Sequence, residues 1–576
     1  MNELEEILGV KFPHDIEICH ATNNSKNVKE NSIFFALQGI KEHGSKYIAE
    51  ALEYGASLIV HNDKKFNSDD KKVIYVEDLD SIKFEFDESC NKFKDTGKIS
   101  NFLQKLYAIN ITSLTFIGIT GTNGKTTTSY LTHQLLTNAK RNSLYIGTNG
   151  VSYNSEEIED SISNKTTPDI FELYEILNTY KNDLEFISLE ISSHALDQNR
   201  LGRIFLDVAC ILNIASDHLD YHKDKEEYIR SKFKIFNVPH EIWNFAHEHQ
   251  FKILNCDSNL ALEHYGANLE NFETSNHRRV NLVSKKLEIK YYVGRSLKYR
   301  KMDLGNWLKH KPSIFYNVKG LDKYIKKDIS NKGLTHSIEI QEEEDYAITH
   351  ECPHYANDNK IDRFSSNLFL DFNNENLVFS RICAVGAEMS NTDYLRTIKT
   401  NKPFKFWARN FKRVRQLINC DVLSLPKGRA DLLKNINSNV VIDYAHNPEA
   451  FSVLMAAIKK NFRNLVVVFG CGGERDIFKR PAMLKVAIDM ATKIIFTSDN
   501  SRGEDFENIF KDASHENDIK DVLVIENRKE AIIAGIKLIG KNDCLLILGK
   551  GHEETQEING SISYFSDYEV VNEIYN

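Results

Sequence analysis

Short apolar segments alternate with helix-like segments along most of this 576-residue chain, and this alternation limits its fold more than any other feature. Between about residues 110 and 425 the apolar segments read TFIGIT, NSLYIGT, LEFISLEI, DVACILNI and FKILNCD. From residue 426 onward they read NVVIDYA, NLVVVFG, TKIIFTS, DVLVIE and CLLILGKG. Strands that alternate with helices pack most readily as a parallel sheet covered by helices. The sequence therefore predicts an α/β protein with two separate parallel sheets.

A shorter version of the pattern precedes residue 110. SIFFALQG, ASLIVHND and KKVIYVEDL are apolar, and KYIAEALEYGAS has helical spacing that stops at Gly55. We therefore expect three domains: a small N-terminal α/β domain at 1–109, a central parallel-sheet domain at 110–425 and a C-terminal Rossmann-like α/β domain at 426–576. Residues 280–365 are rich in Lys, Asn, Tyr and Glu, so we interpret them as a solvated surface insertion that the chemistry does not need.

Composition excludes several classes of function. The net charge of −9 argues against a general nucleic-acid-binding surface. Nine cysteines occur without a CxxC pair, which favours reduced thiols over disulfides or a zinc site. No signal peptide is visible, and no stretch reaches the roughly 18 apolar residues that span a bilayer. We expect a cytoplasmic protein that does not insert into a membrane.

One turn in the central domain carries the clearest chemical signal. The segment GITGTNGKTTTSYL places Gly121, Gly124, Lys125 and Thr126 between a strand-like and a helix-like run. Such a turn surrounds phosphate oxygens with backbone N–H groups at a helix N-terminus. The lysine can reach the terminal phosphates of a nucleotide, and the threonine hydroxyl can bind Mg²⁺. The alternative is a Gly-rich turn with an exposed lysine, so we expect a P-loop-type ATPase domain only in combination with further features.

Such features follow two other strands of the same sheet. Glu190 ends LEFISLE, and His218 and Lys232 lie in the segment ASDHLDYHKDKEEYIRSKFKIF that follows VACILNI. Ligands of open α/β sheets gather at the carboxyl ends of strands, and Mg²⁺ prefers carboxylates together with phosphate oxygens. Taken singly, these residues are more often a helix cap, a hydrogen-bonded histidine and a surface lysine.

Several separate motifs, in order, resemble the Mur ligases, the ATP-dependent amide-forming enzymes of peptidoglycan synthesis. GTNGKTTT, LEISSHALDQNR, NIASDHLDYH and YIRSK resemble their central domain. GRADLL, VVIDYAHNPEAF, VFGCGGERDIFKRPAM, SDNSRGED and LILGKGHEETQ resemble their third domain. NNSKNVKENSIFFALQG resembles, more loosely, the UDP-sugar domain of the branch that adds the third amino acid, diaminopimelate. The resemblance covers most of the chain except about 280–365.

The resemblance implies a reaction and an ATP site. The enzyme would join meso-diaminopimelate to UDP-N-acetylmuramoyl-L-alanyl-D-glutamate through an acyl phosphate. Lys125, Lys232, His218 and Glu190 would be catalytic. Thr126 and Glu190 would hold one Mg²⁺ and His218 a second, and Lys232 would carry a CO₂-derived carbamate whose oxygens also suit Mg²⁺. The implied ATP-binding residues are Gly121, Thr122, Asn123, Gly124, Lys125, Thr126, Thr127, Arg429, Asp443, His446 and Asn447. Thr128 would complete the turn around the nucleotide.

Two further groups follow from the same resemblance. The UDP-sugar peptide would contact Ser25, Lys165, Thr166, Thr167, Ser192, Gln198 and Arg200. Diaminopimelate would contact Arg475, Asp499, Asn500, Ser501, Arg502, Gly549 and Glu553. The planar fork of Arg502 suits the second carboxylate that distinguishes diaminopimelate from lysine. Three positions depart from the family pattern: Lys165 replaces an asparagine, Asn31-Ser32 a Pro-Gly pair, and Ser501 a proline.

Other interpretations stay open at this point. The same ligation could use L-lysine, or the chain could be a folylpolyglutamate synthetase-like ligase, which shares the ATP turn and the carbamate lysine. A catalytically inactive scaffold and a small-molecule kinase are rivals from other classes. We expect a monomer.

Overall fold

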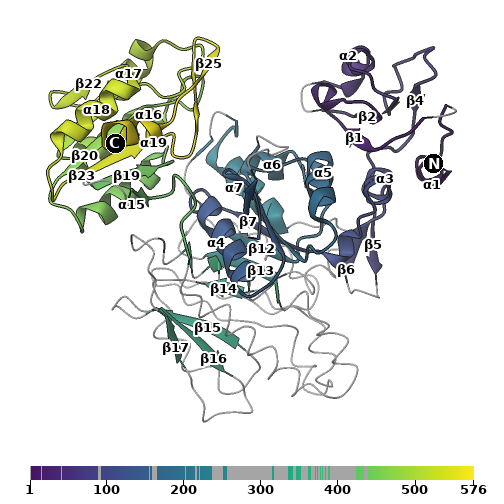
Figure 1. Cartoon of the computed structure of the whole chain (residues 1–576), viewed down its shortest axis with the longest axis horizontal. Helices are drawn as coiled ribbons and strands as arrows, with labels where there is room; N and C mark the ends of the chain where they lie inside the picture. Colours follow the sequence, from purple (N-terminus) through teal and green to yellow (C-terminus); the bar gives the residue numbers. More distant parts are fainter. Residues whose placement is uncertain are drawn as a thin grey trace.

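The computed structural model describes three α/β units (Figure 1). Its described residues are 2–13, 16–39, 42–87, 92–154, 156–158, 165–201, 203–214, 217–218, 221–236, 251–255, 314–316, 335–340, 346–351, 361–364, 423–433 and 439–575, with single residues between 370 and 388. The predicted α/β fold class is confirmed. Each of the thirteen apolar segments quoted above forms a strand.

The first unit contains a four-stranded parallel sheet in the order β1-β2-β3-β4. Its elements are α1 (Asn2–Leu8), β1 (His20–Thr22), η1 (Ser25–Asn27), β2 (Ser32–Ala36), η2 (Gly44–Tyr47), α2 (Ile48–Glu53), β3 (Leu58–His61), β4 (Val73–Tyr75), β5 (Phe84–Asp87), β6 (Lys92–Asp95) and α3 (Lys98–Tyr107). Strands β5 and β6 form a separate hairpin. The helix predicted before Gly55 is α2.

The central unit is built on an eight-stranded sheet in the order β10-β9-β8-β11-β7-β12-β13-β14. Its elements are η3 (Ile111–Ser113), β7 (Thr115–Thr120), α4 (Lys125–Asn138), β8 (Ser143–Gly147), β9 (Gly150–Tyr153), β10 (Glu156–Ile158), α5 (Ile170–Tyr180), β11 (Phe186–Glu190), α6 (Ser193–Asp197), β12 (Val208–Ile211), α7 (Lys225–Phe233), η4 (Lys234–Phe236), β13 (Phe251–Asn255) and β14 (Ile314–Tyr316). Strands β8, β11, β7, β12, β13 and β14 are parallel to one another, and β9 and β10 extend the sheet in antiparallel fashion.

The predicted insertion at 280–365 needs a correction. Ile314–Tyr316 forms β14, which pairs in parallel with β13 at the edge of the central sheet. This part of the segment is therefore a strand of the central sheet and no surface insertion. Strands β15 (Thr335–Ile340), β16 (Tyr346–Glu351) and β17 (Ile361–Phe364) form a sheet of their own. The rest of 280–365 lies outside the described residues.

The third unit carries a six-stranded sheet in the order β18-β19-β23-β20-β21-β22. Its elements are β18 (Asp431–Leu432), β19 (Asn439–Asp443), α15 (Pro448–Lys459), β20 (Leu465–Phe469), α16 (Lys479–Met490), β21 (Lys493–Phe496), α17 (Phe506–Ser514), β22 (Val522–Val524), α18 (Arg528–Leu538), β23 (Cys544–Leu548), β24 (Thr555–Ile558), β25 (Ser561–Tyr564) and α19 (Asp567–Tyr575). Alternate residues of its strands enter two cores. Val467 and Leu546 pack in the core that contains α15, α16 and α17, and Val468 and Leu545 in the one that contains α18 and α19.

A hydrophobic core continues from the first unit into the central one. The ring of Phe35, on β2, lies 5.4 Å from that of Phe102 on α3 and 5.0 Å from that of Phe171 on α5. The predicted boundary at 109/110 lies between α3 and η3, and the hydrophobic packing is continuous across it. Within the described ranges, no helix combines the length and the apolar composition needed to cross a membrane.

Candidate active site

The Gly-rich turn joins the buried strand β7 to the N-terminus of α4. Gly124 directly precedes the helix with a φ of +82°, and a Cβ there would lie 2.5 Å from Oδ1 of Asn376. The left-handed backbone and the close neighbour both require glycine. Because α4 begins at Lys125, its positive dipole end faces the turn and favours an anion.

Asn213, which sequence reasoning missed, holds this turn in shape. Its Oδ1 accepts hydrogen bonds from the N–H groups of Thr122 at 3.1 Å and Asn123 at 2.8 Å. Its Nδ2 donates to the carbonyl of Asn123 at 3.0 Å. Asn213 follows β12, the neighbour of β7 in the sheet. A polar side chain at the carboxyl end of a central strand was the signal that could have identified it.

Two lysines flank the turn: Lys232 is buried, and Lys125 is half-buried. Nζ of Lys125 donates to the carbonyl of Thr122 at 2.9 Å, and Nζ of Lys232, on α7, donates to the carbonyl of Gly121 at 2.8 Å. Burial lowers the pKa of both amines, and the charge of Lys125 lowers the pKa of Lys232 further. Nζ of Lys232 also lies 4.6 Å from the ring centroid of Tyr228. A lowered pKa leaves more of each lysine as the neutral, nucleophilic amine.

A hydrogen-bonded row connects the third unit to the central one at the turn. Nη2 of Arg429 donates to Oγ1 of Thr126 at 2.7 Å. The hydroxyl of Thr126 lies 3.0 Å from both carboxylate oxygens of Glu190, which is 1% exposed. The N–H of Thr148 donates to Oε2 of Glu190 at 2.9 Å. The structure therefore brings two predicted metal ligands, Thr126 and Glu190, together beside the predicted nucleotide residue Arg429.

His218 is placed next to Asp217, a buried acid that sequence reasoning missed. Its Nε2 lies 3.8 Å from Oδ2 of Asp217, and Oδ1 of Asp217 lies 3.7 Å from Nζ of Lys479 on α16. Burial lowers the pKa of His218 to about 3, against the opposing charge of Asp217. Burial would raise the pKa of Asp217, but the charges of His218, His446 and Lys479 hold it below its ordinary value. His218 therefore presents a neutral imidazole at neutral pH.

Four predicted UDP-sugar residues form one connected group at the end of β11. Oγ1 of Thr167 donates to the carbonyl of Glu190 at 2.9 Å and accepts from the N–H of Ser192 at 3.0 Å. Arg200 donates from Nη1 to the carbonyl of Thr167 at 3.1 Å and from Nε to Oε1 of Gln198 at 2.9 Å. The group is thus joined directly to the strand that carries Glu190.

The other predicted UDP-sugar residues are held separately. The hydroxyl of Thr166 lies 3.1 Å from that of Thr148. Nζ of Lys165 donates to Oε1 of Glu172 at 2.9 Å, near the start of α5. Ser25 lies in the first unit, where it donates to Oε2 of Glu50 at 2.5 Å. Among the described residues, no hydrogen bond connects Ser25 to the Thr167 group.

Of the predicted nucleotide residues of the third unit, Arg429 and Asn447 contact the Gly-rich turn. Nδ2 of Asn447 donates to Oδ1 of Asn123 at 3.1 Å. Asp443 accepts the N–H groups of Ala430 and Ala445 at 2.6 Å each, and burial raises its pKa. Burial lowers the pKa of His446 to about 4.

The residues predicted to bind diaminopimelate gather at the carboxyl ends of β20, β21 and β23, which are neighbours in the sheet. Arg502, after β21, donates from Nη1 to the carbonyl of Gly473 at 2.7 Å, in the loop after β20 that also carries Arg475. Gly549, after β23, has a φ of +108°, and a Cβ there would lie 2.4 Å from Oδ2 of Asp499. Nδ2 of Asn500 donates to Oε2 of Glu553 at 3.0 Å. Ser501, between Asn500 and Arg502 in the sequence, is buried.

Comparisons with known proteins bear on this arrangement. Residues 119–305 match the Mur ligase middle domain, and residues 428–551 match the Mur ligase glutamate ligase domain. A UDP-N-acetylmuramoyl-L-alanyl-D-glutamate–2,6-diaminopimelate ligase of Aquifex aeolicus (strain VF5) is 32% identical over 559 residues, which cover 96% of this chain and 92% of the relative.

The chain belongs to the Mur ligase family.

Further relatives agree with this assignment. A ligase of the same name from Rickettsia felis (strain ATCC VR-1525 / URRWXCal2) is 29% identical over 96% of this chain and 95% of its own length. A solved structure with that name has a TM-score of 0.51 at 24% identity and covers 99% of this chain and 98% of its own. MurF from Acinetobacter baumannii has a TM-score of 0.51 at 13% identity, with 95% of each chain covered. At these identities the two structures show the shared fold alone. The middle-domain match ends at 305, so it includes the first part of the predicted insertion.

Two observations test whether this Mur ligase can hold a nucleotide with Mg²⁺. The hydroxyl of Tyr145 and Nε of Arg429 are buried without a hydrogen-bond partner in the described part of the chain. Burial and then the charge of Glu190 raise the pKa of Tyr145, and the charge of Arg429 opposes this rise. Thr126 and Glu190 offer the oxygen atoms that Mg²⁺ prefers. The described residues contain no group of three or more His, Cys, Asp or Glu that could hold a metal. A Mg²⁺ ion bound with a nucleotide does not require such a group, because phosphate oxygens supply its remaining ligands. Thr126 and Glu190 therefore suit a Mg²⁺ ion that is bound together with a nucleotide.

Asn376, like Asn213, contacts the Gly-rich turn but was not among the site residues predicted from the sequence. Oδ1 of Asn376 accepts from Oγ1 of Thr128 at 3.4 Å, in addition to its approach to Gly124. Asn376 lies about 250 residues along the chain from the turn, within an Asn-rich stretch typical of the whole sequence. No local signal could have separated it from its neighbours.

Proposed function

We propose that this chain is an ATP-dependent ligase that joins meso-diaminopimelate to UDP-N-acetylmuramoyl-L-alanyl-D-glutamate in peptidoglycan precursor synthesis. One observation carries the proposal: a row of hydrogen bonds runs from Arg429 through Thr126 and Glu190 to Thr167. It connects the third unit, the phosphate turn and the predicted sugar-peptide group. The diaminopimelate ligases named above, which are similar over nearly their full length, support the choice of substrates.

The first step is phosphoryl transfer. The carboxylate of the sugar peptide attacks the γ-phosphorus of ATP, the bond to the bridging oxygen breaks, and an acyl phosphate and ADP result. Lys125, when protonated at the turn, offsets negative charge on the transferring group. Thr126 and Glu190 would hold Mg²⁺, which supplies further positive charge to the phosphates.

The second step is acyl transfer. The free amine of the amino acid attacks the acyl carbon, phosphate leaves, and the amine loses a proton as the amide forms. The third unit, which carries the amino-acid group, contacts the turn of the central unit through Asn447 and Arg429. Such contacts between units would hold the amine against the acyl phosphate and exclude water, which otherwise hydrolyses it.

Lys232 is the proposed carbamate. Its neutral amine, favoured by burial, can add to CO₂ through the nitrogen lone pair and release one proton, which leaves a carbamate with one negative charge. Compared with a protonated lysine, the carbamate carries a negative charge and offers two oxygen ligands next to the predicted metal site. His218, neutral at its lowered pKa, would contact a second Mg²⁺.

Selection of diaminopimelate is assigned to Arg502. A lysine substrate lacks the second carboxylate, so it would offer the guanidinium no carboxylate to bind. Nη1 of Arg502 is already held by Gly473, which orients the fork. The N–H of Arg502 also donates to the carbonyl of Glu557 at 3.0 Å. These contacts support a fixed direction for the side chain even though Ser501 lacks the ring of proline.

The decisive experiment measures phosphate release and the mass of the product. With ATP, Mg²⁺ and the UDP-sugar dipeptide, addition of meso-diaminopimelate should yield the tripeptide adduct and one phosphate per amide. L-lysine and, separately, dihydrofolate with glutamate serve as alternative substrates. Preference for either alternative would contradict the proposal, a stable phosphorylated product would indicate a kinase, and no turnover with any set would indicate a scaffold.

We further propose that the enzyme is a cytoplasmic monomer. All its proposed substrates are charged and water-soluble, so a cytoplasmic location fits them. Light scattering of the purified protein would test the monomer, and fractionation of cells that express it would test the location.

A further inference from the structure

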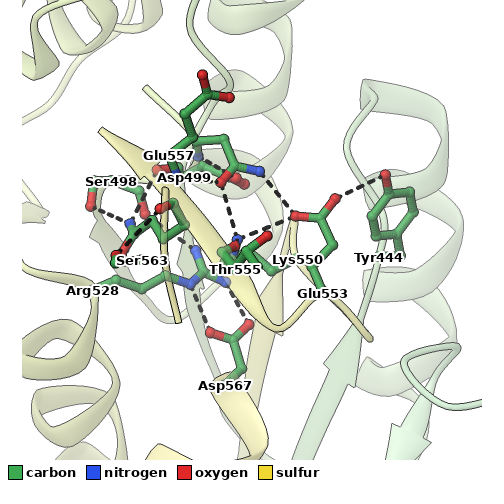
Figure 2. A network of polar contacts seen from close by, with 12 residues as sticks. Tyr444, Ser498, Asp499, Arg528, Lys550, Glu553, Thr555, Glu557, Ser563 and Asp567 are labelled. Atoms are coloured by element: carbon green, nitrogen blue, oxygen red, sulfur yellow. Dashed lines mark hydrogen bonds and ion pairs between the residues drawn. The ribbon is translucent and has the colours of Figure 1, made fainter. Parts of the chain in front are cut away.

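Lys550 is a buried cation whose three donors are all used. Its side chain has an exposed fraction of 0% and contacts Glu553 and Thr555 (Figure 2). In the sequence Lys550 lies between Gly549 and Gly551, which both have a positive φ. Nζ contacts the carbonyl of Thr555 at 2.5 Å, Oε2 of Glu553 at 3.2 Å and Oδ1 of Asn500 at 3.3 Å. An ammonium group has three N–H bonds, so each has one acceptor here.

Two of those acceptors belong to the group proposed to bind the amino acid. Oδ1 of Asn500 also accepts the N–H of Glu557 at 3.0 Å, and its Nδ2 donates to Oε2 of Glu553 at 3.0 Å. Lys550 and the backbone N–H of Glu557 can only donate, and the Glu553 carboxylate can only accept, so one orientation of the amide satisfies all three. Lys550 therefore determines how Asn500 presents its amide.

Glu553 is oriented from both ends. Lys550 and Asn500 contact its Oε2, and the hydroxyl of Tyr444 donates to its Oε1 at 3.3 Å. The Glu553 side chain is 28% exposed while that of Lys550 is 0% exposed. The carboxylate of Glu553 is therefore partly exposed to solvent, while the ammonium group of Lys550 that pairs with it is buried. A neutral side chain at 550 would remove the buried charge that both Glu553 and Asn500 contact, although their hydrogen bonds to Tyr444, Glu557 and each other would remain.

The β24–β25 hairpin supplies the third anchor. Thr555, which accepts from Lys550, begins β24, and the next residues of that strand contact the loop after β21. Nε2 of Gln556 donates to the carbonyl of Asp499 at 3.1 Å. Lys550 therefore connects three segments far apart in sequence: the loop after β21, the turn after β23 and the hairpin.

We propose that Lys550 is a positioning residue of the amino-acid site, which orients Asn500 and Glu553 toward the ammonium groups of the incoming diaminopimelate. This inference rests on the proposed function, because it presumes that the group takes an amino acid. Lys550 itself would not contact the substrate. The proposal predicts a defect specific to the amino acid among the three substrates.

The test compares Lys550→Met, Lys550→Gln and Lys550→Arg with the unchanged enzyme in steady-state assays. Lys550→Met should raise the KM for diaminopimelate by roughly a hundredfold, the loss that a misplacement of about 1 Å can cause. The KM values for ATP and for the UDP-sugar dipeptide should change less than about threefold. Lys550→Arg keeps the charge and should recover part of the loss. If Lys550→Met does not fold, Lys550→Gln shows the same direction.

Arg528→Met is the matched control. Arg528 is equally buried but pairs with Asp567, at 2.7 Å, and contacts neither Asn500 nor Glu553 in the described structure. It should lower the thermal midpoint without a selective rise in the KM for diaminopimelate. A rise as large as that of Lys550→Met, or an unchanged KM in Lys550→Met, overturns the inference. If the unchanged enzyme forms no amide with any amino acid, the proposed function itself fails.

Discussion

At the scale of single residues, Lys232 gives the sharpest prediction. Lys232→Ala should abolish amide formation, because the carbamate that would hold Mg²⁺ cannot form. A small carboxylate such as acetate can occupy the space, so added acetate should restore part of the turnover. Phosphate release with and without acetate measures both effects.

Lys234→Ala is the control for that variant. Lys234 lies two residues further on, is 41% exposed and pairs with Asp197 at 2.6 Å. It should stay active and show no response to acetate. A fully active Lys232→Ala enzyme would refute the carbamate.

We expect Lys125 to stabilise the transition state of phosphoryl transfer more than it contributes to substrate binding. Its position at the turn, 2.9 Å from the carbonyl of Thr122, suits a charge that acts during phosphoryl transfer. Lys125→Ala should lower kcat by roughly 10²–10³, as removal of a transition-state contact does. Calorimetry should show unchanged binding of the UDP-sugar dipeptide. Weaker binding at unchanged kcat would reverse the assignment.

Arg502 should decide the choice of amino acid. Arg502→Ala removes the partner of the second carboxylate, so kcat/KM for diaminopimelate should fall while that for L-lysine stays low. The ratio of the two values, measured with saturating ATP, reports the discrimination. Lys520→Ala, at an exposed position of the same unit, is the control. An Arg502→Ala enzyme with unchanged discrimination would exclude this role.

At the scale of elements, the segment 280–365 divides into parts with different expected roles. Strands β15, β16 and β17 form their own sheet, so deletion of 335–364 should leave ligase activity. A longer deletion that begins at 314 also removes β14 from the edge of the central sheet. Its thermal midpoint should fall by at least about 2–4 °C, the shift that roughly 1 kcal/mol causes in a domain of this size.

Phosphate release and a thermal melt of both deletion variants check this expectation. Equal midpoints would show that β14 adds nothing to the central sheet. Loss of acyl-phosphate formation in the shorter deletion, with an unchanged melt, would show that the separate sheet takes part in the chemistry.

At the scale of the whole molecule, Glu175 on α5 joins the first unit to the central one. It accepts from Nζ of Lys29 at 2.7 Å and lies 3.4 Å from Nε2 of His20. The hydrogen bond from His20, then that from Lys29, lowers the pKa of Glu175 to about 2. Because the pKa of Glu175 is lower in the folded protein, its ionised carboxylate stabilises the folded state above pH 4.5, the ordinary pKa of the group. This stability is lost as the pH falls toward 2.

Glu175→Gln should therefore lower the thermal midpoint at pH 7, and its difference from the unchanged enzyme should shrink below pH 4.5. Thermal melts between pH 7 and pH 3 measure this. Glu42→Gln, which removes an exposed ion pair with Lys46 inside the first unit, is the control. A difference that stays constant with pH would exclude Glu175 as the titrating link.

The sequence by itself determined the elements that depend on local periodicity. All thirteen apolar segments became strands, because an alternation of buried strands and helices permits few other folds. The turn from Gly121 to Thr126 was also readable, since its glycines and its strand–helix context are adjacent in sequence. The β24–β25 hairpin had a readable signal that was missed: Asn559-Gly560, with φ values of +50° and +72°, is a two-residue hairpin turn.

Only the tertiary structure decided which distant residues meet. Asn213 and Asn376 reach the turn from other strands and helices, Asp217 meets Lys479 across two units, and Lys550 connects three loops. An asparagine or a lysine has the same local signal whether it is solvated or buried. Its role depends on burial and on the partners that packing brings within hydrogen-bond distance. Those contacts form between segments that lie as far as 324 residues apart in the sequence.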